Sequence, residues 1–503
     1  MKKNKIYLLA AGLLFSLSGC NDYLDKLPDN RTTLDSPEAV TELLVSAYPN
    51  AIYHQFTETM SDLVGDKVEG PYVYDVPENR DAYLWNDHTT EDQDTPTYYW
   101  ANCYEAIAHA NQALDAINKA GNPEDYTAQK GEALICRAYS HFMLVNLFSK
   151  HYNPTTASSD MGIPYIEEPE TVVFADYERG TVQQVYEKIE RDLVEGLTLI
   201  RDDAYSVAAY HFTKDAANAF ASRFYLYKGE WDKVIEHADK VLTGDPALML
   251  RDWNGTYQSM SRGEIMAKMV SSTEKANLLL CSSNTVWARG YYIWRFSLVS
   301  EIKDKLFPGT WGTDPFGFAY RPSDAGYDSN HHIPKFDEYF KKAGGVNANI
   351  GYPMMMCPLF VAEEVLLNRA EAYAMNNDFG KAFEDLKSFH TKRTGNGAAP
   401  DITVDYINNI YTDTDLPYYE ETYNAEAFYP IEGDEVNVIR FVLDLRKREF
   451  IHEGLRWFDI RRFNMEVVHM YEGSEMVLTK NDLRRVIQLP RQAIANGLPA
   501  NPR

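Results

Sequence analysis

Two stretches of this chain can be laid over each other without a gap, and this internal repeat constrains the fold more than any other feature of the sequence. Residues 221–236 align with residues 369–384. Four aligned pairs are chemically alike: Tyr225 with Tyr373, Trp231 with Phe379, Lys233 with Lys381 and Glu236 with Glu384. Each stretch is a helical run, a short polar turn and an aromatic residue that begins a second run. We therefore expect the same helix–turn–helix unit to occur twice.

Units of this kind, with small residues inside and an aromatic after the turn, are typical of tetratricopeptide-like helix pairs, which bury a continuous core only when at least three are stacked. Helical periodicity predicts four pairs, near residues 97–150, 182–242, 359–393 and 437–463. Long segments rich in Gly, Pro and aromatic residues, notably 61–96 and 250–358, separate them. The predicted fold is mainly α, a scaffold of tetratricopeptide-like helix pairs in one domain over residues 20–503, with long irregular loops that carry the binding face.

The N-terminus has the pattern of an exported protein. Three lysines precede an apolar run over residues 6–17, which is too short to span a bilayer and is typical of a secretory signal peptide. The following Leu17-Ser18-Gly19-Cys20 resembles a bacterial lipobox, so residues 1–19 are expected to be removed and Cys20 to carry lipid. The alternative is an ordinary signal peptide followed by a chance cysteine.

Charge and motifs exclude several classes of function. The 49 Lys and Arg against 74 Asp and Glu give a net charge of -25, the wrong sign for a nucleic-acid partner. The sequence has no Gly-rich phosphate loop, no Gly-x-Ser-x-Gly elbow and no CxxC pair, so we expect no catalytic residues, no cofactor and no metal site. The redox state of the four later cysteines stays open; they are Cys103, Cys136, Cys281 and Cys357.

The strongest short motif is LRKREFIHEGLRWFDIRRF at residues 445–463. It places Glu449, Glu453 and Arg456 at helical spacing among apolar residues. Acid–base catalysis is one interpretation of these acids. We favour a structural ion-pair network that holds a C-terminal helix on the core, with Arg456 as the partner of Glu453, because each acid has a cationic neighbour within helical reach.

Residues 446–462 are similar to the R-x-R-E-F-x-x-E-G-x-R-W-F-D-x-x-R hallmark of the SusD/RagB family of Bacteroidetes outer-membrane lipoproteins. The segment Asn21–Asp25 with Pro28 resembles the N-terminus of that family, and the helix pairs match its scaffold. The resemblance implies a non-catalytic, lipid-anchored glycan-binding protein at the outer membrane, facing the cell exterior. It would capture oligosaccharide and deliver it to a TonB-dependent, SusC-like transporter. The alternatives are a surface glycoside hydrolase and a repeat scaffold that binds peptides or proteins.

Two loop stretches concentrate aromatic residues with polar neighbours, as sugar recognition requires. The first holds Tyr72, Tyr74, Tyr83, Trp85, Asn86, Asp87 and Trp100, and the second holds Trp287, Arg289, Tyr291, Tyr292, Trp294, Arg295, Trp311 and Tyr320. The resemblance places ligand-binding aromatics in both stretches. The expected ligand-binding residues are Trp85, Asn86, Asp87, Trp287, Tyr291, Tyr292 and Trp294. Trp85 and Trp294 should be partly exposed, whereas the helical spacing of Trp100 assigns it to the core.

Overall fold

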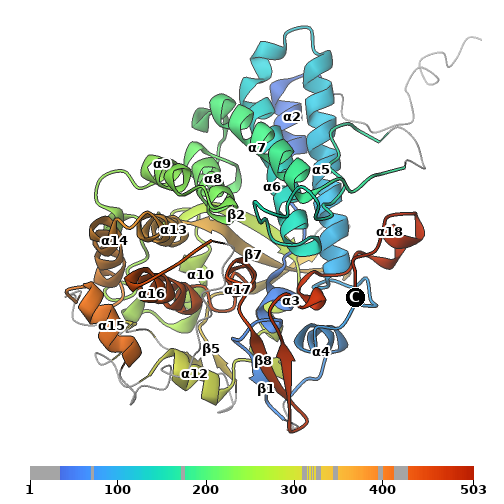
Figure 1. Cartoon of the computed structure of the whole chain (residues 1–503). Coiled ribbons are helices and arrows are strands. Elements are labelled where there is room, and N and C mark those ends of the chain that lie inside the picture. The colour runs from blue at the N-terminus through green and yellow to red at the C-terminus, as the bar shows by residue number, and fades with distance from the viewer. Residues whose placement is uncertain are drawn as a thin grey trace, which may run out of the picture.

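The computed structural model describes residues 34–68, 73–170, 176–308, 314, 316–318, 320, 322–324, 330–343, 349–394, 400–412 and 429–503. Helices dominate this part of the chain, and paired helices form its scaffold (Figure 1), so the predicted fold class is confirmed. Cys20, Tyr72 and Trp311 lie outside the described residues.

The N-terminal half is built on five helices: α5 (Pro96–Lys119), α6 (Thr127–Phe148), α7 (Val182–Leu199), α8 (Lys214–Lys228) and α9 (Trp231–Val241). Thr95 begins α5, because its side chain accepts the Tyr98 amide hydrogen and Pro96 takes the first helical position. Helix α6 packs between α5 and α7 (Figure 1) and is buried over most of its length. Trp100 is buried on α5, as expected from its spacing.

The repeat found in the sequence is a structural repeat. Its second copy is α13 (Ala362–Met375) followed by α14 (Phe379–Thr391), and α13 packs on α8 and α9 of the first copy. The turns also match, since Gly229 and Asn377 occupy aligned positions and both have a left-handed backbone, with φ of 78° and 58°. Glycine and asparagine are the residues that tolerate this conformation best. One turn geometry therefore ends the first helix in both copies.

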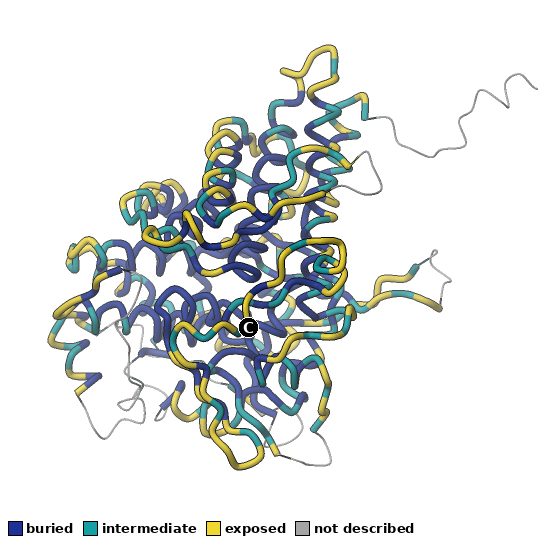
Figure 2. The backbone as a smooth tube through the Cα atoms, turned by 45° about the vertical axis from the view of Figure 1, so that its right-hand side comes forward, coloured by how far each residue is buried: buried dark blue, intermediate teal, exposed yellow. Residues whose placement is uncertain are grey.

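Three further helices complete the C-terminal half: α15 (Val404–Thr412), α16 (Asp434–Glu449) and α17 (Arg456–Arg462). Shorter helices lie in the connecting segments: α2 (Pro37–Leu44), α3 (His54–Thr59), α4 (Pro77–Tyr83), α10 (Arg262–Met269), α11 (Trp287–Gly290), α12 (Ser300–Leu306) and α18 (Arg491–Ala495). The inner faces of the long helices are buried, and exposed residues follow their outer edges and the loops (Figure 2). None of the helices in the described segments is long and apolar enough to span a membrane.

The largest sheet has three antiparallel strands in the order β2-β7-β6: β2 (Asn277–Asn284), β7 (Gly351–Val361) and β6 (Glu338–Lys342). Three two-stranded sheets pair β1 (Gly65–Asp66) with β3 (Phe296–Ser297), β4 (Ser323–Asp324) with β5 (His331–His332), and β8 (Val467–Tyr471) with β9 (Ser474–Leu478). Cys281 lies opposite Cys357 in the main sheet, and both thiols are free and buried, as are those of Cys103 and Cys136.

The 445–463 motif does not form one helix, which corrects the expectation from its spacing. Helix α16 ends at Glu449, and α17 begins only at Arg456. The two residues that break the helix are His452 and Gly454, which have φ of 72° and 70°. Because a right-handed helix needs negative φ at every residue, the chain turns at these two positions.

The motif is nevertheless an ion-pair network. Asp459 pairs within the motif, with Arg446 at 3.0 Å and with Arg462 at 2.8 Å, whereas the two glutamates find their partners in distant segments. Arg393 pairs with Glu449 at 2.7 Å and Lys335 pairs with Glu453 at 2.5 Å. The predicted pairing of Arg456 with Glu453 is wrong, because the Arg456 guanidinium binds both carboxylate oxygens of Asp62, at 2.8 and 2.7 Å. The motif is therefore structural, as expected, but Arg456 and Glu453 form ion pairs with other partners than predicted.

Candidate functional site

The two aromatic loop stretches predicted to carry the binding face lie side by side. Strand β1 pairs with β3, and beyond that pair Tyr74 forms a parallel bridge with Trp294. The Tyr74 amide donates to the Ile293 carbonyl at 3.2 Å, and the Arg295 amide donates to the Tyr74 carbonyl at 2.9 Å. We call the surface formed by Asp66, Lys67, Tyr74, Asp75, Arg80, Tyr292 and Arg295 the junction. Backbone hydrogen bonds therefore fix the two stretches at the junction.

The structure corrects the expectation that the loop tryptophans are partly exposed. Trp85 is 3% exposed, and its indole nitrogen donates to the Met60 carbonyl at 2.9 Å. Trp294 is 7% exposed and packs against the Cα of Gly290, where even a Cβ would lie 2.4 Å from the indole. Aromatic loop residues are buried here because the long loops fold back and contribute to the core.

The other predicted residues divide into buried and accessible groups. Trp287 and Tyr291 are also buried, and each donates a hydrogen bond to a backbone carbonyl, of His452 and Ile333 respectively. Asn86 and Asp87 are exposed, and Tyr292 is partly buried. Of the seven expected ligand-binding residues, these last three remain able to touch a ligand.

Trp85 belongs to a column of stacked rings that the sequence did not indicate. From one end to the other the column consists of Arg484, Trp85, His469, Tyr83, Phe296 and Arg295. Successive ring centroids are 4.4, 4.0 and 4.2 Å apart, with planes within 20° of parallel. The end guanidinium groups lie 5.7 Å from the Trp85 ring and 5.0 Å from the Phe296 ring. Because rings and cations cover both faces of Trp85, no face is left for a sugar.

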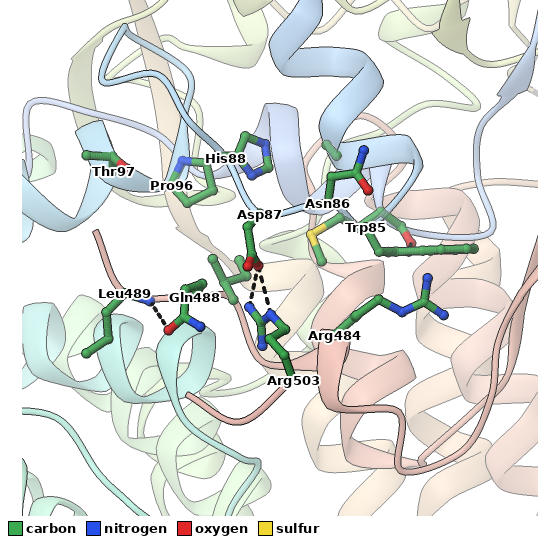
Figure 3. A pocket seen from close by; sticks show the side chains of 13 residues that line it. Trp85, Asn86, Asp87, His88, Pro96, Thr97, Arg484, Gln488, Leu489 and Arg503 are labelled. Atoms are coloured by element: carbon green, nitrogen blue, oxygen red, sulfur yellow. Dashed lines mark hydrogen bonds and ion pairs between the residues drawn. The ribbon is translucent and has the colours of Figure 1, made fainter. Parts of the chain in front are cut away.

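A small, open hollow lies at the Arg484 end of this column. Trp85 forms part of its wall, and polar side chains from several segments surround the opening (Figure 3). Asp87 points at Arg503, whose Nε and Nη2 donate to one Asp87 oxygen at 2.8 and 2.6 Å. His88 also lines the hollow, and burial lowers the pKa of its imidazole, although the nearby Asp81 carboxylate opposes this shift. The hollow offers hydrogen-bonding groups rather than an aromatic face.

The junction lies at the Arg295 end of the column and does offer an aromatic face, since the Tyr74 side chain is 58% exposed. Beside it, the Lys67 ammonium donates to the Tyr292 carbonyl at 2.5 Å and to Asn330 Oδ1 at 3.0 Å. Burial lowers the pKa of Lys67 to about 8. The Tyr292 ring stacks on His332 at 4.8 Å and lies 5.3 Å from the Arg262 guanidinium. The junction thus combines an exposed aromatic ring on a hydrogen-bonded backbone segment with oriented polar groups, as sugar binding requires.

Charge at the junction is balanced by arginine–carboxylate pairs. Arg295 donates to both oxygens of Asp66, at 2.8 and 2.7 Å, and reaches Asp75 at 3.1 Å. Arg80 also binds Asp75, at 2.6 Å. Desolvation of Asp75 acts to raise its pKa, but the two arginines outweigh it and the pKa is lowered. The Asp75 carboxylate is therefore an ionised acceptor for ligand hydroxyl groups at neutral pH.

Several residues of this region were missed or underrated by sequence reasoning. His469 comes from β8, far along the chain, and nothing in its local sequence indicates that it stacks between two aromatic rings. Tyr74 and Arg295 lie in the two predicted stretches, but no local sequence signal distinguishes Tyr74 as the exposed aromatic residue. Within the described segments, no group of three or more His, Cys, Asp or Glu is placed to hold a metal ion.

Two family models match the chain. One is described as starch-binding associating with outer membrane and matches residues 22–226. The other, the SusD family model, matches residues 331–492, and the two segments together cover more than half of the chain. Among curated proteins, SusD-like protein P2 from Formosa agariphila is 25% identical over 268 residues, 50% of this chain and 48% of that protein. In this match the chain therefore spans about half the length of the relative.

Solved structures share the fold. A SusD superfamily protein from Bacteroides thetaiotaomicron VPI-5482 superimposes with a TM-score of 0.63 at 19% identity, covering 94% of this chain and 100% of that chain. A laminarin-binding SusD-like protein superimposes with a TM-score of 0.54 at 15% identity, covering 93% of this chain and 98% of that chain. At these identities the similarity establishes the fold, and the site has to be argued from the residues of this chain.

Proposed function

The chain belongs to the SusD/RagB family, and we propose that it binds an oligosaccharide at the cell surface without cleaving it and delivers it to a SusC-like, TonB-dependent outer-membrane transporter. The observation that carries this proposal is the junction, where an exposed tyrosine is fixed by backbone hydrogen bonds among paired arginines and carboxylates. A laminarin-binding protein with the same fold supports a carbohydrate ligand.

We propose that Tyr74 provides the stacking face for the sugar. A pyranose ring presents C–H groups on one face and hydroxyl groups at its edge, so it suits a flat aromatic ring bordered by hydrogen-bonding groups. Tyr74 has this setting, with Asp75 following it in the chain and Arg295 bonded to its carbonyl. Because the backbone of Tyr74 is hydrogen-bonded on both sides, little backbone entropy would be lost when the ring binds a sugar.

The residues selected from the sequence receive different roles in this proposal. Asn86 and Asp87 are exposed and would bind ligand hydroxyl groups at the hollow, and Tyr292 would contact the ligand as part of the junction. The buried Trp85, Trp287, Tyr291 and Trp294 would support the site from below without touching the ligand. We also propose that Cys20 carries the lipid that holds the protein on the outer membrane.

The carboxyl groups of this region favour binding over hydrolysis. A glycoside hydrolase needs one carboxyl group with a raised pKa as general acid, near a second carboxylate. At the junction, Asp66 and Asp75 are both bound by arginine, and the pKa of Asp75 is lowered. Burial raises the pKa of Asp94 to about 6, but this side chain is 4% exposed and is held by the Thr285 hydroxyl and the Val286 amide. Neither setting suits a catalytic acid.

Calorimetric titration with laminarin-derived and starch-derived oligosaccharides, followed by chromatography of the recovered sugar, tests the proposal. Saturable binding with intact oligosaccharide is expected. Release of new reducing ends would show that the chain is a hydrolase and not only a binding protein. Binding of peptides but of no oligosaccharide would favour a protein-interaction scaffold. Co-purification of a transporter subunit from outer membranes of the native host tests the delivery step.

A further inference from the structure

The hairpin formed by β6 and β7 carries a second group of exposed aromatic side chains, on elements that take no part in the junction. Tyr339 is 44% exposed, Phe340 54%, Ile350 74% and Tyr352 53%. Large apolar side chains gathered on one exposed element, rather than scattered singly, mark an interaction surface. The exposed side chains of the hairpin therefore indicate an interaction surface.

Strand register divides these residues between the two faces of the hairpin. Tyr339 pairs with Met354, and Lys341 pairs with Tyr352. Residues directly opposite each other in an antiparallel pair share a face, and residues two apart along a strand do as well. Tyr339, Lys341 and Tyr352 therefore lie on one face, which we call the tyrosine face. Phe340 and Lys342 lie on the opposite face.

The tyrosine face continues onto strand β2, which positions it. Ser282 Oγ and the Tyr339 hydroxyl are 2.6 Å apart and hydrogen-bonded. Asn284 Nδ2 donates to the Tyr98 hydroxyl at 3.0 Å, and both residues are partly buried. On the hairpin itself, Tyr339 and Tyr352 are diagonal neighbours, about 7 Å apart in such a ladder, so both rings are within reach of one ligand.

The one charged strand residue on this face is a cation, Lys341, although the chain as a whole carries a net charge of -25. Lys341 is exposed, and no ion pair to it is formed within the described segments. The nearest acid in the strand, Glu338, lies on the other face, where its carboxylate is bound by Arg289 at 2.6 Å. A cation beside two exposed rings complements a ligand that combines apolar faces with negative charge.

We propose that the tyrosine face is a second sugar-binding platform and that its ligand is an acidic glycan, one bearing carboxylate or sulfate groups. The proposal rests on the proposed function, because it assumes that the chain binds glycans. Tyr339 and Tyr352 stack on the sugar rings, and Lys341 pairs with the acidic group. The platform lies on β6 and β7, whereas the junction is built around β1 and β3, so we treat the two surfaces as separate sites.

The experiment measures binding of oligogalacturonate, its carboxyl-reduced counterpart and a sulfated galactan oligosaccharide to the full chain. Tyr352→Ala and Lys341→Gln should each weaken oligogalacturonate binding at least fivefold, and the loss from Lys341→Gln should vanish with the carboxyl-reduced sugar. The matched controls, Phe340→Ala and Lys342→Gln, change the same residue types on the opposite face of the hairpin and should leave the affinity unchanged. The sulfated sugar shows whether sulfate can replace carboxylate.

Equal effects from variants on both faces, or unchanged affinity for every acidic sugar in Tyr352→Ala, would overturn the platform. Tyr74→Ala separates this outcome from failure of the proposed function. If Tyr74→Ala abolishes binding of a neutral oligosaccharide while the hairpin variants change nothing, sugar binding at the junction is supported and the proposal of a second platform is wrong. If the wild-type chain binds no glycan at all, both proposals are wrong.

Discussion

The backbone amide of Tyr74 donates a hydrogen bond to the carbonyl of Ile293, at 3.2 Å. This contact joins the loop that precedes α5 to the long segment that follows α9, and it leaves the Tyr74 ring exposed. A surface residue held in this way has its backbone ordered before the ligand arrives, which lowers the entropic cost of binding. We propose that the Tyr74 ring is where the glycan binds.

Trp85 should act as a core residue. Trp85→Ala removes the ring between His469 and Arg484 and strands the Met60 carbonyl, so we expect a loss of about 3–5 kcal/mol in the free energy of unfolding. Urea unfolding gives this value. The glycan affinity of the folded fraction should be unchanged, and a fully stable variant that has lost binding would show instead that Trp85 touches the ligand.

The Arg456–Asp62 pair should stabilise the fold in a pH-dependent way. Burial of Asp62 acts to raise its pKa, but the Arg456 guanidinium outweighs this and lowers the pKa to about 2. Because the folded pKa lies below the unfolded value, the stabilisation is fully present above about pH 4 and is lost as the pH falls toward 2. Arg456→Ala should cost about 1–3 kcal/mol at pH 7, the range for a hydrogen bond to a charged group.

Unfolding of the wild type and Arg456→Ala at several pH values between 2 and 7 checks this sign. The difference in stability should shrink below pH 4. Asp62→Asn serves as the matched variant, because it removes the same ion pair and keeps the side-chain size. A difference that stays constant down to pH 2 would mean that Arg456 stabilises the fold through packing alone.

Gly229 should be required at the turn of the first repeat for two separable reasons. Its φ of 78° disfavours any side chain, and a Cβ there would lie 2.3 Å from the Tyr429 ring. Gly244 has a φ of 80° with nothing within 4 Å of the Cβ position, so Gly244→Ala measures the backbone effect alone. We expect about 1–2 kcal/mol of destabilisation for Gly244→Ala and a clearly larger loss for Gly229→Ala. Equal losses would show that Tyr429 moves aside freely.

The helical scaffold could be predicted because its signals are local. The alignment of residues 221–236 with 369–384 correctly identified two helix pairs. The two pairs also share a contact that the sequence did not reveal. Lys233 lies 4.6 Å from the Tyr225 ring centre, and Lys381 lies 5.2 Å from that of Tyr373. Aligned residues thus make the same cation–π contact in both repeats.

The site could be predicted only by region, because exposure depends on contacts between distant segments. Composition located both loop stretches, and their pairing through Tyr74 and Trp294 shows that they lie together. Composition could not show that His469, from β8, covers one face of Trp85. The partner of Arg456 was mispredicted for the same reason, since Asp62 is close in space and distant in sequence.

The most direct test of the central claim is calorimetric titration of Tyr74→Ala with the oligosaccharide that binds the wild type most tightly. Tyr210→Ala is the matched control, because Tyr210 is also exposed, at 40%, and lies in a different part of the chain. Loss of a stacking ring removes about 1–3 kcal/mol of binding energy, so Tyr74→Ala should weaken binding about fivefold or more with an unchanged melting temperature. Tyr210→Ala should bind like the wild type. Wild-type affinity in Tyr74→Ala would contradict the account.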